Sequence, residues 1–146
     1  MISQDQAMEK MEEGWIQVNM FFEVLAINED AAISSLETII NKIDNEPNAK
    51  IFFKKNAEPQ RVEKPLKDIE VAYSSSVEIK AVLKRFEDVV HIVIKYGPSA
   101  IEIISPKNIT MNMGEAQGIL NMIAELMHRF AAAGAGGIVF MRPEGR

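Results

Sequence analysis

The sequence contains no cysteine among its 146 residues. Disulfide bonds, thiolate metal sites and cysteine nucleophiles are therefore excluded, and the lack of disulfides is compatible with a reducing compartment. The first 14 residues have no basic stretch followed by an apolar run, so they do not resemble a signal peptide. No apolar run approaches the roughly 20 residues needed to cross a bilayer. We expect a cytoplasmic protein that does not bind a membrane.

Positive charge is also scarce, because 16 Lys and Arg face 21 Asp and Glu for a formal net charge of −5. Nucleic-acid binding depends largely on neutralising phosphates, which an acidic chain does poorly. One segment, residues 50–67, combines basic and aromatic side chains as single-strand RNA readers do. These side chains are Lys50, Phe52, Phe53, Lys54, Lys55, Arg61, Lys64 and Lys67. Glu58, Glu63 and Asp68 offset this charge, so we predict no nucleic-acid binding.

The chain has the common length of one domain, and such a chain can bury a core without metal or disulfide. Apolar residues at 47% and charged residues at 25% are near the averages of globular proteins. Isoleucine outnumbers leucine about three to one. This bias and the lack of cysteine together resemble the composition of proteins from thermophiles. We expect residues 1–146 to form a single domain.

Hydrophobic spacing predicts a helix, a strand and a second helix in the first third of the chain. Residues 4–13 are strong helix formers and predict a helix, which ends at Gly14. Residues 16–27 alternate with a period of two and become apolar on both faces, which predicts a strand covered on both sides. Asn28 caps a helix whose apolar residues recur at helical spacing as far as Ile43.

The middle of the chain predicts two strands followed by a helix. Residues 49–57 and 69–73 read as strands, and residues 59–68 between them as a loop or an interrupted edge strand. Serines at 74–76 break the second strand. Ser75 and Glu78 have capping-box spacing and predict a helix that ends near Tyr96.

Residues 91–105 predict how that helix ends and which element follows it. Gly97 is expected as a left-handed cap, with Pro98 preventing continuation. The β-branched run at residues 91–95 leaves open whether the helix ends there or a strand forms. Residues 99–105 then predict a strand.

A third long helix comes next, because Asn112 and Glu115 repeat the capping-box spacing. Its apolar stripe consists of Ala116, Ile119, Leu120, Ile123, Leu126, Met127 and Phe130. Residues 137–141 predict a last short strand.

The predicted order is helix, β, α, β, β, α, β, α, β. Residues 16–105 have the order of a ferredoxin-like split β-α-β sandwich, with an antiparallel sheet and helices on one face. An extra N-terminal helix at residues 4–13 and a helix-strand extension at residues 113–141 complete an α/β (α+β) fold. Because this fold carries many unrelated functions, the order alone assigns none.

Two helical pairs, Glu87 with His91 and Glu125 with His128, place a carboxylate and an imidazole on one helix face. A metal centre would need further acidic ligands from neighbouring helices, and the apolar stripes provide none. We predict no metal and no cofactor.

Catalytic chemistry finds little support. The serines at 74–76 lack the glycine-flanked turn that exposes a nucleophile, and a serine cluster before a helix is typical of a turn and cap. The glycines of AAAGAGG come after a helix, whereas a phosphate loop precedes one. We predict no catalytic residues.

The start of the third helix is a candidate anion or ligand site, because free amides and the helix dipole there attract negative charge. Its residues are Asn112, Gly114, Glu115 and Gln117.

The first strand offers the strongest functional signal. Its second face and flanks carry Trp15, Phe21, Leu25 and Ile27, and aromatic and apolar residues of this kind are enriched at interface cores. We predict a non-enzymatic, self-associating binding or assembly module, a homodimer through this strand. The alternative is a small-molecule-binding regulatory domain with its ligand at a helix start near a subunit interface. An enzyme that uses carboxylates ranks third.

Overall fold

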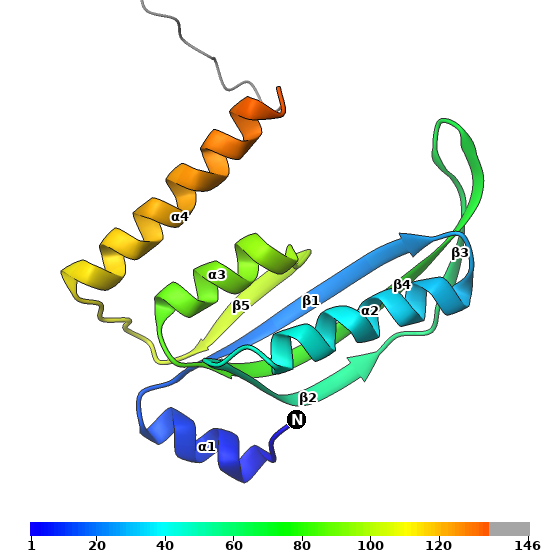
Figure 1. Ribbon diagram of the computed structural model, residues 1–146. Coiled ribbons are helices and arrows are strands. Elements are labelled where there is room, and N and C mark those ends of the chain that lie inside the picture. The colour runs from blue at the N-terminus through cyan, green and yellow to red at the C-terminus, as the bar shows by residue number, and fades with distance from the viewer. Residues whose placement is uncertain (135–146) are drawn as a thin grey trace, which may run out of the picture. The chain divides into compact units, whose positions relative to one another are not determined.

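The structure is a computed structural model of the 146-residue chain, and it describes residues 1–134 (Figure 1). The chain divides into two compact units, Met1–Thr110 and Met111–Arg146. The second unit is described as far as Gly134. The predicted single domain of residues 1–146 stays a prediction.

The first unit contains three helices and a five-stranded antiparallel sheet. The elements are α1 (Gln4–Glu12), β1 (Ile16–Ala26), α2 (Glu29–Asp44), β2 (Ala49–Asn56), β3 (Gln60–Leu66), β4 (Ile69–Leu83), α3 (Phe86–Tyr96) and β5 (Ala100–Ser105). The strand order is β2-β4-β1-β5, and β3 also pairs with β4. All four pairings are antiparallel. The predicted α+β class is confirmed, and β4 separates β1 from β2, the two strands that α2 connects.

The core lies between one face of the sheet and α2. Alternate residues of β1, from Ile16 to Phe22, are almost fully buried, and so are the facing residues of β4. They pack with one stripe of α2, which consists of Ala32, Leu36, Ile40 and Ile43. Figure 1 shows α2 and α3 together on this side of the sheet. The period of two in the strands and of about 3.6 in the helix thus bring their apolar faces together.

The N-terminal cap of α2 forms as predicted. Asn28 Oδ1 accepts a hydrogen bond from the Ala31 N–H at 2.7 Å, which satisfies one of the free amides of the first helical turn.

Replacing this cap gives a direct test of the helix assignment. We expect Asn28→Ala to lower the free energy of unfolding by about 1 kcal/mol, because the amide then loses its acceptor. Urea denaturation followed by circular dichroism measures the change. Ser34→Ala, an exposed change inside the same helix, is the control and should leave the stability unchanged or slightly higher. Equal losses in both variants would contradict the role of the cap.

The largest correction concerns residues 74–83. The prediction that the serines break a strand and that a helix begins near Ser75 is wrong, because β4 continues from Ile69 to Leu83. Residues Val77 to Leu83 pair with β1 on one side and with β2 on the other. Those pairings bury every second side chain of β4, and this tertiary gain outweighs the local capping-box signal.

The helix α3 therefore begins only at Phe86, where Asp88 Oδ2 accepts from the Arg85 N–H at 3.0 Å. The alternative left open for residues 91–95 is resolved in favour of helix. Gly97 ends α3 with a φ of 57°, the left-handed cap that the sequence predicted.

Within residues 59–68, Gln60–Leu66 form the edge strand β3, and its register with β4 shifts between Glu63 and Leu66. Of the two sequence-based alternatives, a loop and an interrupted edge strand, the structure therefore has the strand. The strand β3 pairs with the first half of β4, and β2 pairs with its second half. The outer edge of β4 is thus shared by two strands, and residues 57–59 connect them.

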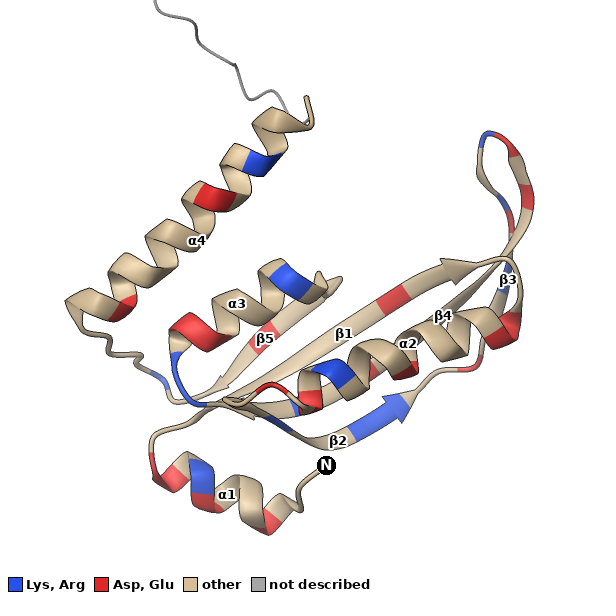
Figure 2. Cartoon of the chain, in the orientation of Figure 1, with Lys and Arg blue, Asp and Glu red and all other residues tan. Residues whose placement is uncertain are grey.

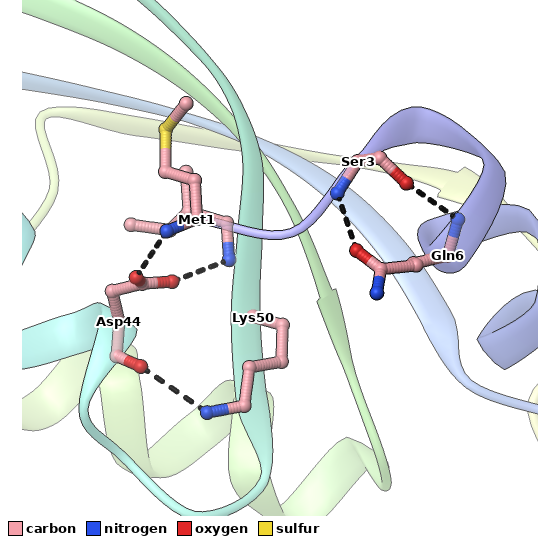
Figure 3. Close-up of polar contacts among 6 residues, drawn as sticks. Met1, Ser3, Gln6, Asp44 and Lys50 are labelled. Atoms are coloured by element: carbon pink, nitrogen blue, oxygen red, sulfur yellow. Dashed lines mark hydrogen bonds and ion pairs between the residues drawn. The ribbon is translucent and has the colours of Figure 1, made fainter.

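The N-terminal segment is held against β2 by Asp44, at the end of α2 (Figure 3). Asp44 Oδ2 lies 2.9 Å from the Met1 ammonium, and Oδ1 accepts from the Ile51 N–H at 3.0 Å. Burial acts to raise the pKa of Asp44, but these two donors outweigh it and hold the pKa below its ordinary value. At the start of α1, Ser3 and Gln6 form a reciprocal capping box.

The second unit contains α4 (Met113–Ala132), the predicted third long helix. Asn112 caps it, and none of its residues is buried. The predicted strand at 137–141 lies outside the described residues. Within residues 1–134, no helix combines the length and apolarity that crossing a bilayer requires.

Candidate functional site

The face of the sheet opposite α2 is only partly covered within the first unit. Val82 is buried on this side, and α1 packs against β2 and β4. We call the remaining area the open face. Its residues include Asn19, Phe21, Glu23 and Leu25 of β1, Phe53 and Lys55 of β2, Ser74, Ser76, Glu78 and Lys80 of β4, and Ala100 and Glu102 of β5.

The structure brings two of the four predicted interface residues to the open face. Phe21 is 38% exposed and Leu25 is 52% exposed, and their spacing of four residues along β1 places them on the same side. Ile27 comes after the end of β1 and is 81% exposed. Trp15 precedes β1, and its ring lies 4.3 Å from the Nζ of Lys10 in α1. Phe21 and Leu25 therefore form the apolar centre, with the other two at the ends of the strand.

Sequence reasoning missed Phe53 as a member of this surface. The register of β2 shifts between Ile51 and Phe53, so Phe53 lies opposite Lys80 with its ring 4.7 Å from the lysine Nζ. Because Phe52 and Phe53 are adjacent, the sequence does not show which of the two side chains points into the core. Strand alternation alone could not have assigned Phe53 to the open face, because a bulge resets the alternation.

A hollow of about 210 Å³ lies beside Phe21 on the open face. It is lined by Phe21, Lys55, Asn56, Ala57, Ser76, Val77 and Glu78. An apolar side chain on a complementary surface has room to enter it.

The charges of the open face are mixed in sign. Lys55 lies opposite Glu78 in the β2–β4 register, and Lys80 is the second cation. Glu23 accepts a hydrogen bond from the Ser74 hydroxyl at 2.8 Å. Figure 2 shows both acidic (red) and basic (blue) positions along the strands. The absence of nucleic-acid binding stays a prediction.

The predicted anion site at residues 112–117 has part of its hydrogen-bonding capacity occupied. Asn112 Oδ1 accepts from the Glu115 N–H at 2.8 Å, and Gln117 Nε2 donates to Asn121 at 3.2 Å. The Glu115 carboxylate itself provides negative charge in the first helical turn. Gly114 lies close to Asn112, since a Cβ there would lie 3.3 Å from Oδ1. The anion site stays a prediction.

His91 faces Glu46 across a distance of 3.5 Å from Nε2 to Oε2. Glu46 lies just after α2, and it also accepts from Lys95 at 2.8 Å and from the Tyr96 hydroxyl at 2.6 Å. These two hydrogen bonds hold the pKa of Glu46 below its ordinary value, and burial and the bond to Glu46 raise the pKa of Tyr96. In residues 1–134, no three His, Asp or Glu side chains lie close enough to hold a metal ion. The cluster connects the end of α2 with the end of α3.

The pKa of Glu46 predicts how stability changes with pH. A carboxylate whose pKa is lowered by folding stabilises the folded state above its unfolded pKa, and this contribution is lost as the pH falls through the folded value. We therefore expect the stability of the wild type to fall more between about pH 6 and pH 3.5 than that of Glu46→Gln. Urea unfolding at both pH values measures the difference. Glu12→Gln, at the end of α1, is the control and should change with pH like the wild type.

The fold and the open face define a class of protein. It is a small α+β protein whose antiparallel sheet is covered by α2 and α3 on one face and only partly covered on the other. The chain belongs to the MJ0538 family, which it matches over residues 17–141. The match begins within β1 and extends over α4. No curated protein matches the chain. Membership of this family states no activity, so the open face is the feature that bears on function.

Proposed function

We propose that the protein is a non-enzymatic, self-associating module of the cytoplasm, and that the open face binds a second copy of the same chain. The observation that carries the proposal is the group of half-exposed apolar side chains on the strands of this face: Phe21 and Leu25 on β1 and Phe53 on β2.

The energetics favour covering these side chains. Full burial of a leucine or phenylalanine contributes roughly 1.5–3 kcal/mol. Phe21, Leu25 and Phe53 are each between about a third and half exposed, so covering them contributes about 1 kcal/mol each. Isolated exposed apolar residues are ordinary on protein surfaces, but three on one sheet face beside a hollow are typical of an interface core.

The mixed charges favour a second copy over other partners. A two-fold axis brings the same surface of both chains together, so a lysine of one copy can meet a glutamate of the other. Lys55 and Lys80 with Glu23 and Glu78 give the open face this self-complementary character. We therefore propose a homodimer, and no role for nucleic acid, metal or a cofactor.

The molar mass in solution tests the proposal. Size-exclusion chromatography with light scattering at micromolar concentration is expected to give twice the chain mass of 16.3 kDa. A single-chain mass at all micromolar concentrations would refute self-association and would assign the cover of the open face to the chain itself.

A further inference from the structure

A second cleft lies between α2 and the edge of the sheet, and it meets the hollow of the open face at Asn56 and Ala57. Its volume is about 250 Å³, slightly below the roughly 300–1,000 Å³ of common ligand pockets. Residues from α2, from the connection between β2 and β3 and from β4 line it: Ile33, Leu36, Glu37, Asn56, Ala57, Glu58, Pro59 and Ser75. The cleft forms where β2 leaves the edge of β4 and β3 replaces it.

Ser75 is the feature of this cleft that packing does not explain. It is only 3% exposed, and it is the one buried polar residue in the part of the chain that the structure describes. No side-chain hydrogen bond joins its hydroxyl to another described residue, although its neighbour Ser74 donates to Glu23. Only Asn19 Oδ1 is fully enclosed without a partner within residues 1–134, so the Ser75 hydroxyl retains access to the cleft. A hydroxyl that reaches a cleft and has no protein partner can hydrogen-bond to whatever occupies the cleft, whether water or a ligand.

The polar groups that line the cleft share one chemical property, since all of them can accept hydrogen bonds. Glu37 and Glu58 contribute carboxylates, Asn56 an amide oxygen and Ser75 a hydroxyl oxygen. Among the described residues, the one cation paired with this set is Lys54, whose Nζ lies 3.0 Å from Glu37 Oε1. Ser75 and Asn56 can also donate, but the two carboxylates only accept and outnumber this cation, so a ligand that brings donors and positive charge suits the cleft.

The apolar part of the lining selects the rest of the ligand. Ile33 and Leu36 belong to α2, and Ala57 and Pro59 belong to the β2–β3 connection. An alkyl chain fits between these side chains, and a metal ion does not use them. A metal is also disfavoured because no three acidic or histidine side chains converge in residues 1–134.

We propose that the cleft between α2 and the β2–β3 connection binds a small aliphatic amine. The ammonium group donates to the Ser75 hydroxyl and to the carboxylates of Glu37 and Glu58, and the alkyl chain packs against Ile33 and Leu36. The cleft shares Asn56 and Ala57 with the hollow of the open face, whereas Ser75, Glu37 and Glu58, the proposed partners of the ammonium group, line the cleft and not the hollow.

Nuclear magnetic resonance of the ¹⁵N-labelled full chain tests the site, with 1,4-diaminobutane as the probe. Saturable shifts of the amide signals of Glu58 and Ser75, which line this cleft and not the hollow of the open face, are expected. The neutral analogue 1,4-butanediol has the same carbon chain without the charge, and it should produce no saturable shift. Identical responses to both compounds, or no saturable response to the diamine, would overturn the proposal.

Three variants separate a ligand site from a purely structural role. Ser75→Ala and Glu58→Gln should each weaken diamine binding about tenfold, as expected for a lost hydrogen bond to a charged group. Ser75→Ala should fold at least as stably as the wild type, since the hydroxyl has no partner to lose. Glu70→Gln removes the same charge from an exposed position on β4 outside the cleft. An equal loss of affinity in Glu70→Gln and Glu58→Gln would indicate general attraction to an acidic protein and would refute the site.

Discussion

Leu25→Asp is expected to convert the proposed dimer into a monomer. Leu25 is 52% exposed on the open face, and it lies opposite Ser74 in the β1–β4 register. At a two-fold interface the substitution acts in both copies, so two unpaired carboxylates would be removed from water. We expect dissociation to become at least 100-fold more favourable, which corresponds to about 2.7 kcal/mol. Light scattering across a concentration series should give the single-chain mass of 16.3 kDa.

Leu66→Asp is the matched control for this experiment. Leu66 ends β3, away from Phe21 and Phe53, and its exposure of 61% is similar to that of Leu25. The same chemical change there should leave the dimer intact. Dissociation in both variants would show that added negative charge, rather than the open face, controls association. A dimeric Leu25→Asp protein would place the interface elsewhere.

Phe22→Ala is expected to cause the largest loss of stability, about 3–5 kcal/mol. Phe22 is 2% exposed and is among the largest buried side chains. Its removal leaves a cavity between β1, β4 and α2, because packed neighbours relax only in part. Urea denaturation followed by fluorescence and circular dichroism gives the free energy of unfolding. Since native domains are stable by roughly 5–15 kcal/mol, this loss is a large fraction of the total stability.

Phe21→Ala provides the control one residue away. Phe21 lies on the opposite face of the same strand and is 38% exposed. Both substitutions are best compared in the Leu25→Asp background, where the proposed interface is absent. There Phe21→Ala should cost less than about 1.5 kcal/mol, because less apolar surface returns to water. Similar losses for the two phenylalanines would contradict the assignment of the faces of β1.

Most of the secondary structure could be predicted because its signals are local. The apolar stripe and the cap of Asn28 define α2, and strict alternation over residues 16–22 defines the inward face of β1. Gly97 ends α3 with a positive φ, as its sequence position before Pro98 predicted. In these segments propensity, period and tertiary packing agree.

The long strand β4 could not be predicted from local signals. Residues 77–83 satisfy a period of two, but Ile79, Val82 and Leu83 also fit helical spacing into Phe86. The capping-box spacing of Ser75 and Glu78 favoured the helix. The deciding interactions are non-local, since β1 and β2 hydrogen-bond to both edges of this segment.

The candidate surfaces divide in the same way. Alternation along β1 was sufficient to place Phe21 and Leu25 on a second apolar face. The position of Phe53 on this face depends on the bulge in β2, and no residue type in the sequence predicts that bulge. The cleft beside α2 forms because β3 replaces β2 along one edge of β4. Ser75, which the sequence predicts as a helix cap, is therefore a buried residue of a strand.

By itself, the sequence determined the α+β class, the helices α1, α2 and α4, and the apolar character of both faces of β1, because hydrophobic period and capping act within a few residues of each other. Only the tertiary structure decided that residues 74–83 are strand, that Phe53 lies beside Lys80, and that Ser75 faces a cleft. The physical reason is that a strand gains its hydrogen bonds and its burial from partners far away in the chain, whereas a helix satisfies its backbone within itself.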